Sequence, residues 1–254
     1  MALLDAVFFD IDDTLFPTTE FAQRARWNAV KAMVAAGLER PEQEVYQELV
    51  EVISEFTSNY GNHYDHLLRR LGEDAVRDVN PALIVAAGVA AYHDTKFREL
   101  KPFPDVVPLL SSLKQAGLRR GIVTHGWTLK QAEKLVRLKL NEHLDQDAVF
   151  ISDQIGISKP NPKLYQTALS DLRLDARRVM FVGDSPTHDI APPAKLGMVT
   201  VWSRRAAKVD LAGTGIEADH VVDDFEQLAE ILRERYEVDL PVNLGNPQAS
   251  AAEG

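Results

Sequence analysis

Acidic residues gather directly after a short apolar run near the start of the chain. The run Leu4–Phe9 predicts a buried strand, and Asp10, Asp12 and Asp13 follow it. Residues i and i+2 point the same way at the end of a strand, so Asp10 and Asp12 can face one ligand. A hard divalent cation such as Mg²⁺ would relieve their repulsion, because it binds oxygen ligands and keeps waters for a substrate. The alternative is a turn whose aspartates cap the next helix, and the segment alone leaves both interpretations open.

A second apolar run, Arg120–Val123, is followed by Thr124, His125 and Gly126. Thr124 is consistent with an ordinary turn residue. Placed before the N-terminus of a helix, however, its hydroxyl and the backbone N–H groups that follow it could hold a phosphate.

Two further segments supply a cation and two more acids. Lys159 lies in a loop that contains two prolines, where a lysine is most often solvated. Asp184 follows the apolar run Arg178–Val182, and Asp189 falls in the first turn of the helix predicted after it. Asp184 therefore lies at a strand end with Asp189 close behind it.

Short apolar runs alternate with helical patterns through most of the chain. This alternation predicts an α/β fold: a Rossmann-like, doubly wound parallel sheet with helices on both faces. Ligands of such sheets bind beyond the carboxyl ends of the strands, so the four segments above should converge there. The expected strands are Leu4–Phe9, Arg120–Val123, Ala148–Ile151, Arg178–Val182, Val199–Trp202 and His220–Val222.

One region breaks the alternation. Residues 18–100 show only helical patterns and predict an all-helical cap inserted after the first strand. The catalytic core would then comprise residues 1–17 and 101–239. Residues 240–254 mix Pro, Asn, Gly, Ser and Ala without periodicity, which predicts a disordered tail.

The composition limits the classes of partner. The 254 residues carry a formal net charge of −10, which repels nucleic-acid backbones, and the absence of cysteine excludes disulfides and thiolate metal sites. The N-terminus lacks the basic leader of a signal peptide, and no apolar run approaches membrane-spanning length. We therefore expect a cytoplasmic protein that binds neither nucleic acid nor membrane and that is a monomer or a homodimer.

The order of the four segments resembles the motifs of the haloacid dehalogenase-like (HAD) hydrolase superfamily over residues 1 to 236. Asp10–Thr14 matches the first motif, Thr124 the second and Lys159 the third, and Gly183–Asp189 matches the fourth. The helical insertion is similar to the small cap of this family, known as type C1.

The resemblance implies a reaction. Asp10 would attack phosphorus and carry the phosphoryl group, and Asp12 would protonate the leaving oxygen and then deprotonate the water that hydrolyses the intermediate. The implied activity is Mg²⁺-dependent hydrolysis of a small phosphorylated metabolite through a phospho-aspartate. Carboxylates are adequate nucleophiles for this chemistry, which depends above all on positioning and charge neutralisation.

The resemblance also implies two sets of ligands. Mg²⁺ would be held by the Asp10 carboxylate and the Asp12 backbone carbonyl, by Asp184, and by Asp189 through bound water. The phosphoryl group would be bound by Asp10, Thr124, His125, Gly126 and Lys159.

Other classes of protein share parts of this pattern. A 2-haloacid dehalogenase uses the same nucleophile on carbon, but the family's dehalogenases lack the aspartate that this chain has as Asp12. A phosphotransferase or mutase differs only in the acceptor. A signalling receiver domain is about half as long, and the region where its acceptor would fall, Glu51–Thr57, predicts helix. A non-catalytic binding protein would not need the complete set of motif residues.

Substrate specificity should come from the helical insertion, because the motif residues contact only the phosphoryl group. Asn59, Asn62, His63 and Arg70 form its densest cluster of hydrogen-bond donors. A fork-shaped guanidinium could pair with a carboxylate or a second phosphate of the substrate. The alternative is a solvated helix face.

Overall fold

The computed structural model describes residues 3–57 and 60–245. These residues divide into two compact units. One is formed by the chain up to Thr18 together with the chain from Lys101 onward, and the other by Thr19–Leu100. Each unit has its own buried core.

A six-stranded parallel sheet forms the centre of the first unit. Its strand order is β3-β2-β1-β4-β5-β6, and all five neighbouring pairs are parallel. The predicted fold class is confirmed, and each expected strand is present. The strands are β1 (Ala6–Phe9), β2 (Arg119–Thr124), β3 (Val149–Ile151), β4 (Val179–Gly183), β5 (Val199–Ser203) and β6 (His220–Val222).

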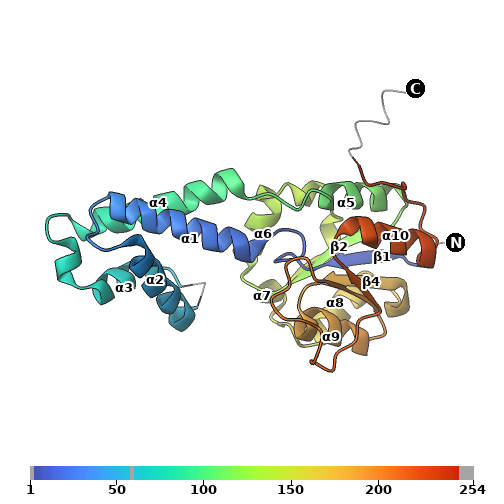
Figure 1. Cartoon of the computed structure of the whole chain (residues 1–254). Helices are drawn as coiled ribbons and strands as arrows, with labels where there is room; N and C mark the ends of the chain where they lie inside the picture. Colours follow the sequence, from blue (N-terminus) through green and yellow to red (C-terminus); the bar gives the residue numbers. More distant parts are fainter. Residues whose placement is uncertain (1–2, 58–59, 246–254) are drawn as a thin grey trace. The chain divides into compact units, whose positions relative to one another are not determined.

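Helices cover both faces of this sheet. Figure 1 shows α5 and α10 on one face and α8 and α9 on the other. The α-helices of this unit are α5 (Val106–Gln115), α6 (Thr128–Arg137), α7 (Ser152–Ile155), α8 (Lys163–Asp171), α9 (Ala191–Lys195) and α10 (Phe225–Tyr236).

Among residues 3–57 and 60–245 of the whole chain, no helix is both long and apolar enough to cross a lipid bilayer.

The central strand β1 is buried on both faces. Phe8 packs in one cluster with residues of α8, and Phe9 points the opposite way, with its ring 5.7 Å from that of Phe225 on α10. Burial of each phenylalanine contributes roughly 1.5–3 kcal/mol to the free energy of unfolding. Opposite Phe8 in the register lies Gly121 of β2, where a Cβ would come within 2.5 Å of the Phe8 ring. The glycine therefore leaves room for the phenylalanine.

The second unit consists of helices and connecting turns in its described part. The helices are α1 (Thr18–Ala35), α2 (Glu42–Phe56), α3 (His63–Leu71) and α4 (Pro81–Glu99). Their shared core includes Met33, Leu49, Leu67 and Ile84, all fully buried. The start of α4 is capped by Asn80, whose side chain accepts a hydrogen bond from Ala82 N at 3.0 Å.

The last described residues pack against α10. Leu240 and Leu244 are only 6% and 3% exposed. The backbone N–H of Leu244 donates to the Glu226 carboxylate at 3.1 Å, and Arg233 donates to Pro241 O at 2.7 Å. The expectation of a disordered tail is therefore wrong for residues 240–245, because two of its leucines are buried although the segment has no periodic pattern. Residues 246–254 lie outside the described residues.

This packing predicts the effect of two truncations. A chain ending at Asp239 lacks both buried leucines, whereas a chain ending at Gly245 keeps them. We expect the shorter chain to unfold at a temperature lower by about 5 °C or more, measured by circular dichroism on both truncated proteins. Equal unfolding temperatures would contradict the burial of the two leucines.

Candidate active site

The candidate site lies at the carboxyl ends of three neighbouring strands. Asp10 follows β1, Thr124 ends β2, and Asp184 follows β4. Because β1 is paired with both β2 and β4, these three strand ends are adjacent. This is the edge at which a parallel sheet binds its ligands.

A buried lysine ties two of the carboxylates together. Lys159 Nζ donates to Asp10 Oδ1 at 2.8 Å and to Asp189 Oδ1 at 2.6 Å, and its side chain is only 2% exposed. Burial disfavours the charge of this lysine, but the carboxylates of Asp10 and Asp189 outweigh that cost and raise its pKa. Lys159 is thus a permanent cation inside the site, not a solvated loop lysine.

Asp10 is buried among other charges. Burial raises its pKa to about 6, helped by the repulsion of Asp189 and Asp12 and opposed by Lys159. Its backbone N–H donates to Val182 O of β4 at 2.9 Å, which fixes the strand end. Within the described chain, Asp10 Oδ2 receives no hydrogen bond from a protein donor. This oxygen is available to a ligand.

Three carboxylates form a cluster that fits a hard cation. Oxygen atoms of Asp10, Asp184 and Asp189 lie within 4.8 Å of one another. Burial, followed by the repulsion of Asp189 and Asp10, raises the pKa of Asp184 to about 8. A divalent cation would offset this repulsion, and oxygen ligands are those that Mg²⁺ prefers.

A glycine brings Asp189 to the strand end. Asp189 lies in the helical turn Pro186–Ile190, and its Oδ2 accepts a hydrogen bond from Ser185 N at 3.0 Å. A Cβ on Gly183 would lie 2.3 Å from Asp189 Cβ. Only a residue without a side chain lets this turn approach the end of β4 so closely.

Thr124 is buried with an unused hydroxyl. The residue is fully buried, and its Oγ1 has no hydrogen-bond partner in the described part of the chain. An unpaired buried hydroxyl costs roughly 1–3 kcal/mol. A phosphate oxygen is an acceptor that would satisfy it.

The loop after Thr124 differs from the expectation. Gly126 N donates to Ser152 Oγ at 3.0 Å, so this N–H group is already used and does not hold a phosphate in this arrangement. The His125 ring lies 2.6 Å from Ser158 Oγ through Nδ1, and burial, followed by the charges of His188 and Lys159, lowers its pKa. His125 is therefore neutral at neutral pH.

Asp12 has partners that sequence reasoning missed. Its Oδ1 accepts hydrogen bonds from Thr18 Oγ1 and from Lys134 Nζ, each at 2.6 Å. Its Oδ2 accepts from Lys134 Nζ at 2.7 Å and from Gln131 Nε2 at 3.0 Å. Burial alone would raise the pKa of Asp12, but Lys134 and these hydrogen bonds outweigh it and lower the pKa.

The sequence carried one signal for these partners. Gln131 and Lys134 are three residues apart and so share one face of α6. The spacing of Thr128 and Gln131 is also that of a capping box, in which the Gln131 side chain would return to the start of the helix. Instead, Asp153 accepts hydrogen bonds from the N–H and the hydroxyl of Thr128, at 2.9 and 2.7 Å, which leaves Gln131 free to contact Asp12.

The specificity candidates lie in the helical unit. Asn59 is outside the described residues, and Asn62 precedes α3 without a side-chain capping bond. His63 Nε2 lies 2.7 Å from Thr57 O. The Arg70 guanidinium binds Glu48 at 3.1 Å and also Glu55, so its donors are engaged within the unit and are not a free fork for an anionic substrate.

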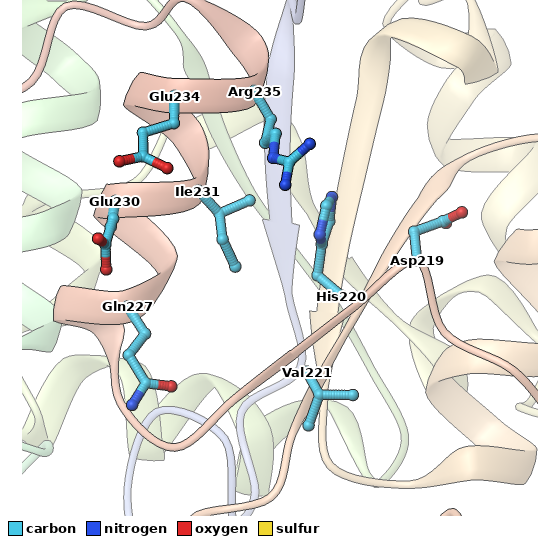
Figure 2. Close-up of a pocket in the computed structure, with 8 residues that line it drawn as sticks. All are labelled: Asp219, His220, Val221, Gln227, Glu230, Ile231, Glu234 and Arg235. Atoms are coloured by element: carbon cyan, nitrogen blue, oxygen red, sulfur yellow. The ribbon is translucent and has the colours of Figure 1, made fainter.

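A hollow with a volume of about 520 Å³ lies elsewhere on the first unit, between β6 and α10 (Figure 2). Its one histidine, His220, lies 2.8 Å from the Tyr236 hydroxyl through Nε2. None of the strand-end carboxylates lines this hollow, so it is separate from the candidate site. The residues that line it are Asp219, His220, Val221, Gln227, Glu230, Ile231, Glu234 and Arg235.

A doubly wound parallel sheet with clustered strand-end carboxylates and a buried lysine defines a class of α/β enzymes that handle anionic groups together with a divalent cation. The sequence profile of the haloacid dehalogenase-like hydrolases matches residues 4–197, and the chain belongs to this family.

Proteins with similar sequences indicate which kind of hydrolase this chain is. A glyceraldehyde 3-phosphate phosphatase of Methanopyrus kandleri is 44% identical over 239 residues, which cover 91% of this chain and 98% of the relative. An enzyme of the same name from Pyrococcus abyssi is 42% identical over 200 residues, 79% of this chain and 81% of the relative. This chain is therefore a phosphatase, which decides against the dehalogenase and receiver alternatives.

A solved structure shares the fold. A putative β-phosphoglucomutase from Thermotoga maritima is 19% identical and superposes with a TM-score of 0.68. The match covers 91% of this chain and all of the other.

The unused Thr124 hydroxyl predicts opposite effects on stability and on phosphate binding. Thr124→Val keeps the shape and removes a buried group that has no protein partner, so the unfolding temperature should be unchanged or higher. Inhibition by inorganic phosphate should weaken by about tenfold or more, because a hydrogen bond to a charged group is lost. The inhibition constant of phosphate measures the effect on binding, and thermal unfolding measures the effect on stability.

A matched control is available at the end of β5. Ser203 is also buried with a hydroxyl that has no partner among the described residues, and Ser203→Ala should leave phosphate inhibition unchanged. Unaltered phosphate inhibition in Thr124→Val would show that Thr124 is not a phosphate ligand.

Proposed function

We propose that this phosphatase is a Mg²⁺-dependent phosphomonoester hydrolase that acts on a small phosphorylated metabolite through a phospho-aspartate at Asp10. The observation that carries the proposal is the contact of Lys159 with both Asp10 and Asp189 at the strand ends. It holds an attacking carboxylate, a cation for the phosphoryl oxygens and an anionic metal ligand in one buried site.

In the first half of the reaction, Asp10 Oδ2 attacks phosphorus while Oδ1 stays on Lys159. A bond forms between Oδ2 and phosphorus, and the bond from phosphorus to the ester oxygen breaks. Because Asp12 is ionised at rest, it first takes up the proton of the bound phosphomonoester monoanion and then gives this proton to the leaving oxygen, so an alcohol departs. The Lys159 ammonium and the Thr124 hydroxyl bind the phosphoryl oxygens in place of water.

In the second half, Asp12 accepts a proton from water as the water oxygen attacks phosphorus. The bond between phosphorus and Asp10 Oδ2 breaks, and inorganic phosphate leaves. Asp12 then passes this proton to the departing phosphate, so the site returns to its starting charge. The contact with Lys134 favours the ionised form of Asp12 that this half requires.

The cluster of Asp10, Asp184 and Asp189 supports a role for Mg²⁺. The carboxylates of Asp10 and Asp184 and the backbone carbonyl of Asp12 would hold the ion, with Asp189 beside them. When bound, Mg²⁺ neutralises charge on the transferring phosphoryl group.

Glyceraldehyde 3-phosphate is the substrate that the relatives favour. The two relatives described above carry this name and align over most of their length with this chain. For substrate recognition by the helical unit, Asn62 and His63 remain candidates, whereas Arg70 is engaged by two glutamates.

Loss of the attacking oxygen tests the proposal. Asp10→Asn keeps the shape of the side chain but removes the nucleophile, so phosphate release from glyceraldehyde 3-phosphate should fall by a factor of about 10³ or more. Asp5→Asn makes the same change to a partly exposed aspartate just before β1, paired with Arg178, and should keep near-native turnover. A folded Asp10→Asn protein with near-native activity would overturn the mechanism. Activity confined to other phosphate esters would overturn the substrate alone.

Metal removal tests the cofactor. Excess chelator should abolish phosphate release, and added Mg²⁺ should restore it. Ca²⁺ should restore it poorly, because its longer bonds and higher coordination number would misplace the attacking carboxylate. Mg²⁺ should also raise the unfolding temperature of the native protein, and less so that of Asp184→Asn. Full activity in excess chelator is the result that would rule out the metal.

A further inference from the structure

Three donors from two segments hold the Asp12 carboxylate. Thr18 stands where the chain enters α1, and Gln131 and Lys134 lie on one face of α6. Lys134 Nζ bridges both carboxylate oxygens, at 2.6 and 2.7 Å. With Thr18 on Oδ1 and Gln131 on Oδ2, four contacts are made to a group that has about four acceptor positions.

Lys134 is committed to this single carboxylate. Its side chain is 19% exposed, and in the described part of the chain Asp12 is the only acid that it pairs with. An ammonium that bridges both oxygens fixes the carboxylate plane, which one hydrogen bond alone would leave free to rotate.

The Gln131 contact is the one that can be exchanged. Gln131 Nε2 lies 3.0 Å from Asp12 Oδ2 but 2.5 Å from His125 O, so its shorter contact is to the loop after Thr124. A water molecule can therefore replace Gln131 as a hydrogen-bond partner of Asp12 Oδ2, while Lys134 and Thr18 keep the carboxylate in place. Water would then meet an oriented carboxylate oxygen.

We propose that Lys134 is a positioning residue that holds Asp12 as the proton acceptor for hydrolysis of the phospho-aspartate. This inference rests on the proposed function. It gives the second half of the reaction its own positioning residue, on a helix that contributes none of the phosphate or metal ligands proposed above.

Two-step kinetics separate this role from a structural one. For an aryl phosphate, whose leaving group needs no proton, kcat/KM reports formation of the phospho-aspartate and is independent of its hydrolysis. A defect confined to hydrolysis therefore lowers kcat and KM by the same factor. It also produces a burst of phenol equal to the number of active sites, followed by slow turnover.

We expect this pattern in the full-length Lys134→Met protein with p-nitrophenyl phosphate. Its kcat should fall about tenfold or more, a part of what a general base contributes. Its kcat/KM should stay within about threefold of the native value, with a burst of one nitrophenol per site. Lys134→Arg, whose guanidinium can also bridge two carboxylate oxygens, should recover most of kcat.

Controls separate the possible failures. Arg137→Met removes a cation from the same helix, but one paired with Glu133, and should leave kcat and KM unchanged. Lys134→Gln gives the same readout if Lys134→Met does not fold. The inference is overturned if kcat/KM falls with kcat and no burst appears, or if kcat is unchanged. An Asp10→Asn protein that stays active would instead overturn the proposed function itself.

Discussion

One buried ammonium organises the site: Lys159 Nζ, which lies between the carboxylates of Asp10 and Asp189. Three acids crowd the ends of β1 and β4, and their burial, followed by their mutual repulsion, raises the pKa values of Asp10 and Asp184. Removing a charge from water is costly unless it is paired, and here cation and anions compensate one another. The same arrangement gives an acidic protein a place to bind a phosphate.

The fold supplies the close approaches that this arrangement requires. Strand β1 lies between β2 and β4, so the ends of three strands meet. Phe8 and Phe9 anchor β1 to opposite layers, and Gly121 makes room for the Phe8 ring. Gly183 lets the turn that carries Asp189 pack against the end of β4. The ionisable groups are thus positioned by apolar packing and by glycines at two tight contacts.

Much of this could be predicted from the sequence, because strand ends have a local signature. Apolar runs followed by Asp10, Thr124 and Asp184 predicted both the strands and their shared edge. The partners of Asp12 could not be predicted, since Lys134 resembles any lysine on an amphipathic helix until the fold brings it to Asp12. The use of Gly126 N–H by Ser152 and the burial of Leu244 depend equally on distant segments. Local patterns reveal which residues end an element, but not which side chain crosses over to meet them.

In the proposed mechanism the phosphoryl group passes through Asp10. Native enzyme mixed with ³²P-labelled glyceraldehyde 3-phosphate can be quenched in acid within the first turnover and digested, and the labelled peptide can be identified by mass spectrometry. A phospho-aspartate intermediate predicts label on Asp10 that disappears when unlabelled substrate is added before the quench. Phosphate release without labelled protein, or with label on another residue, would contradict it.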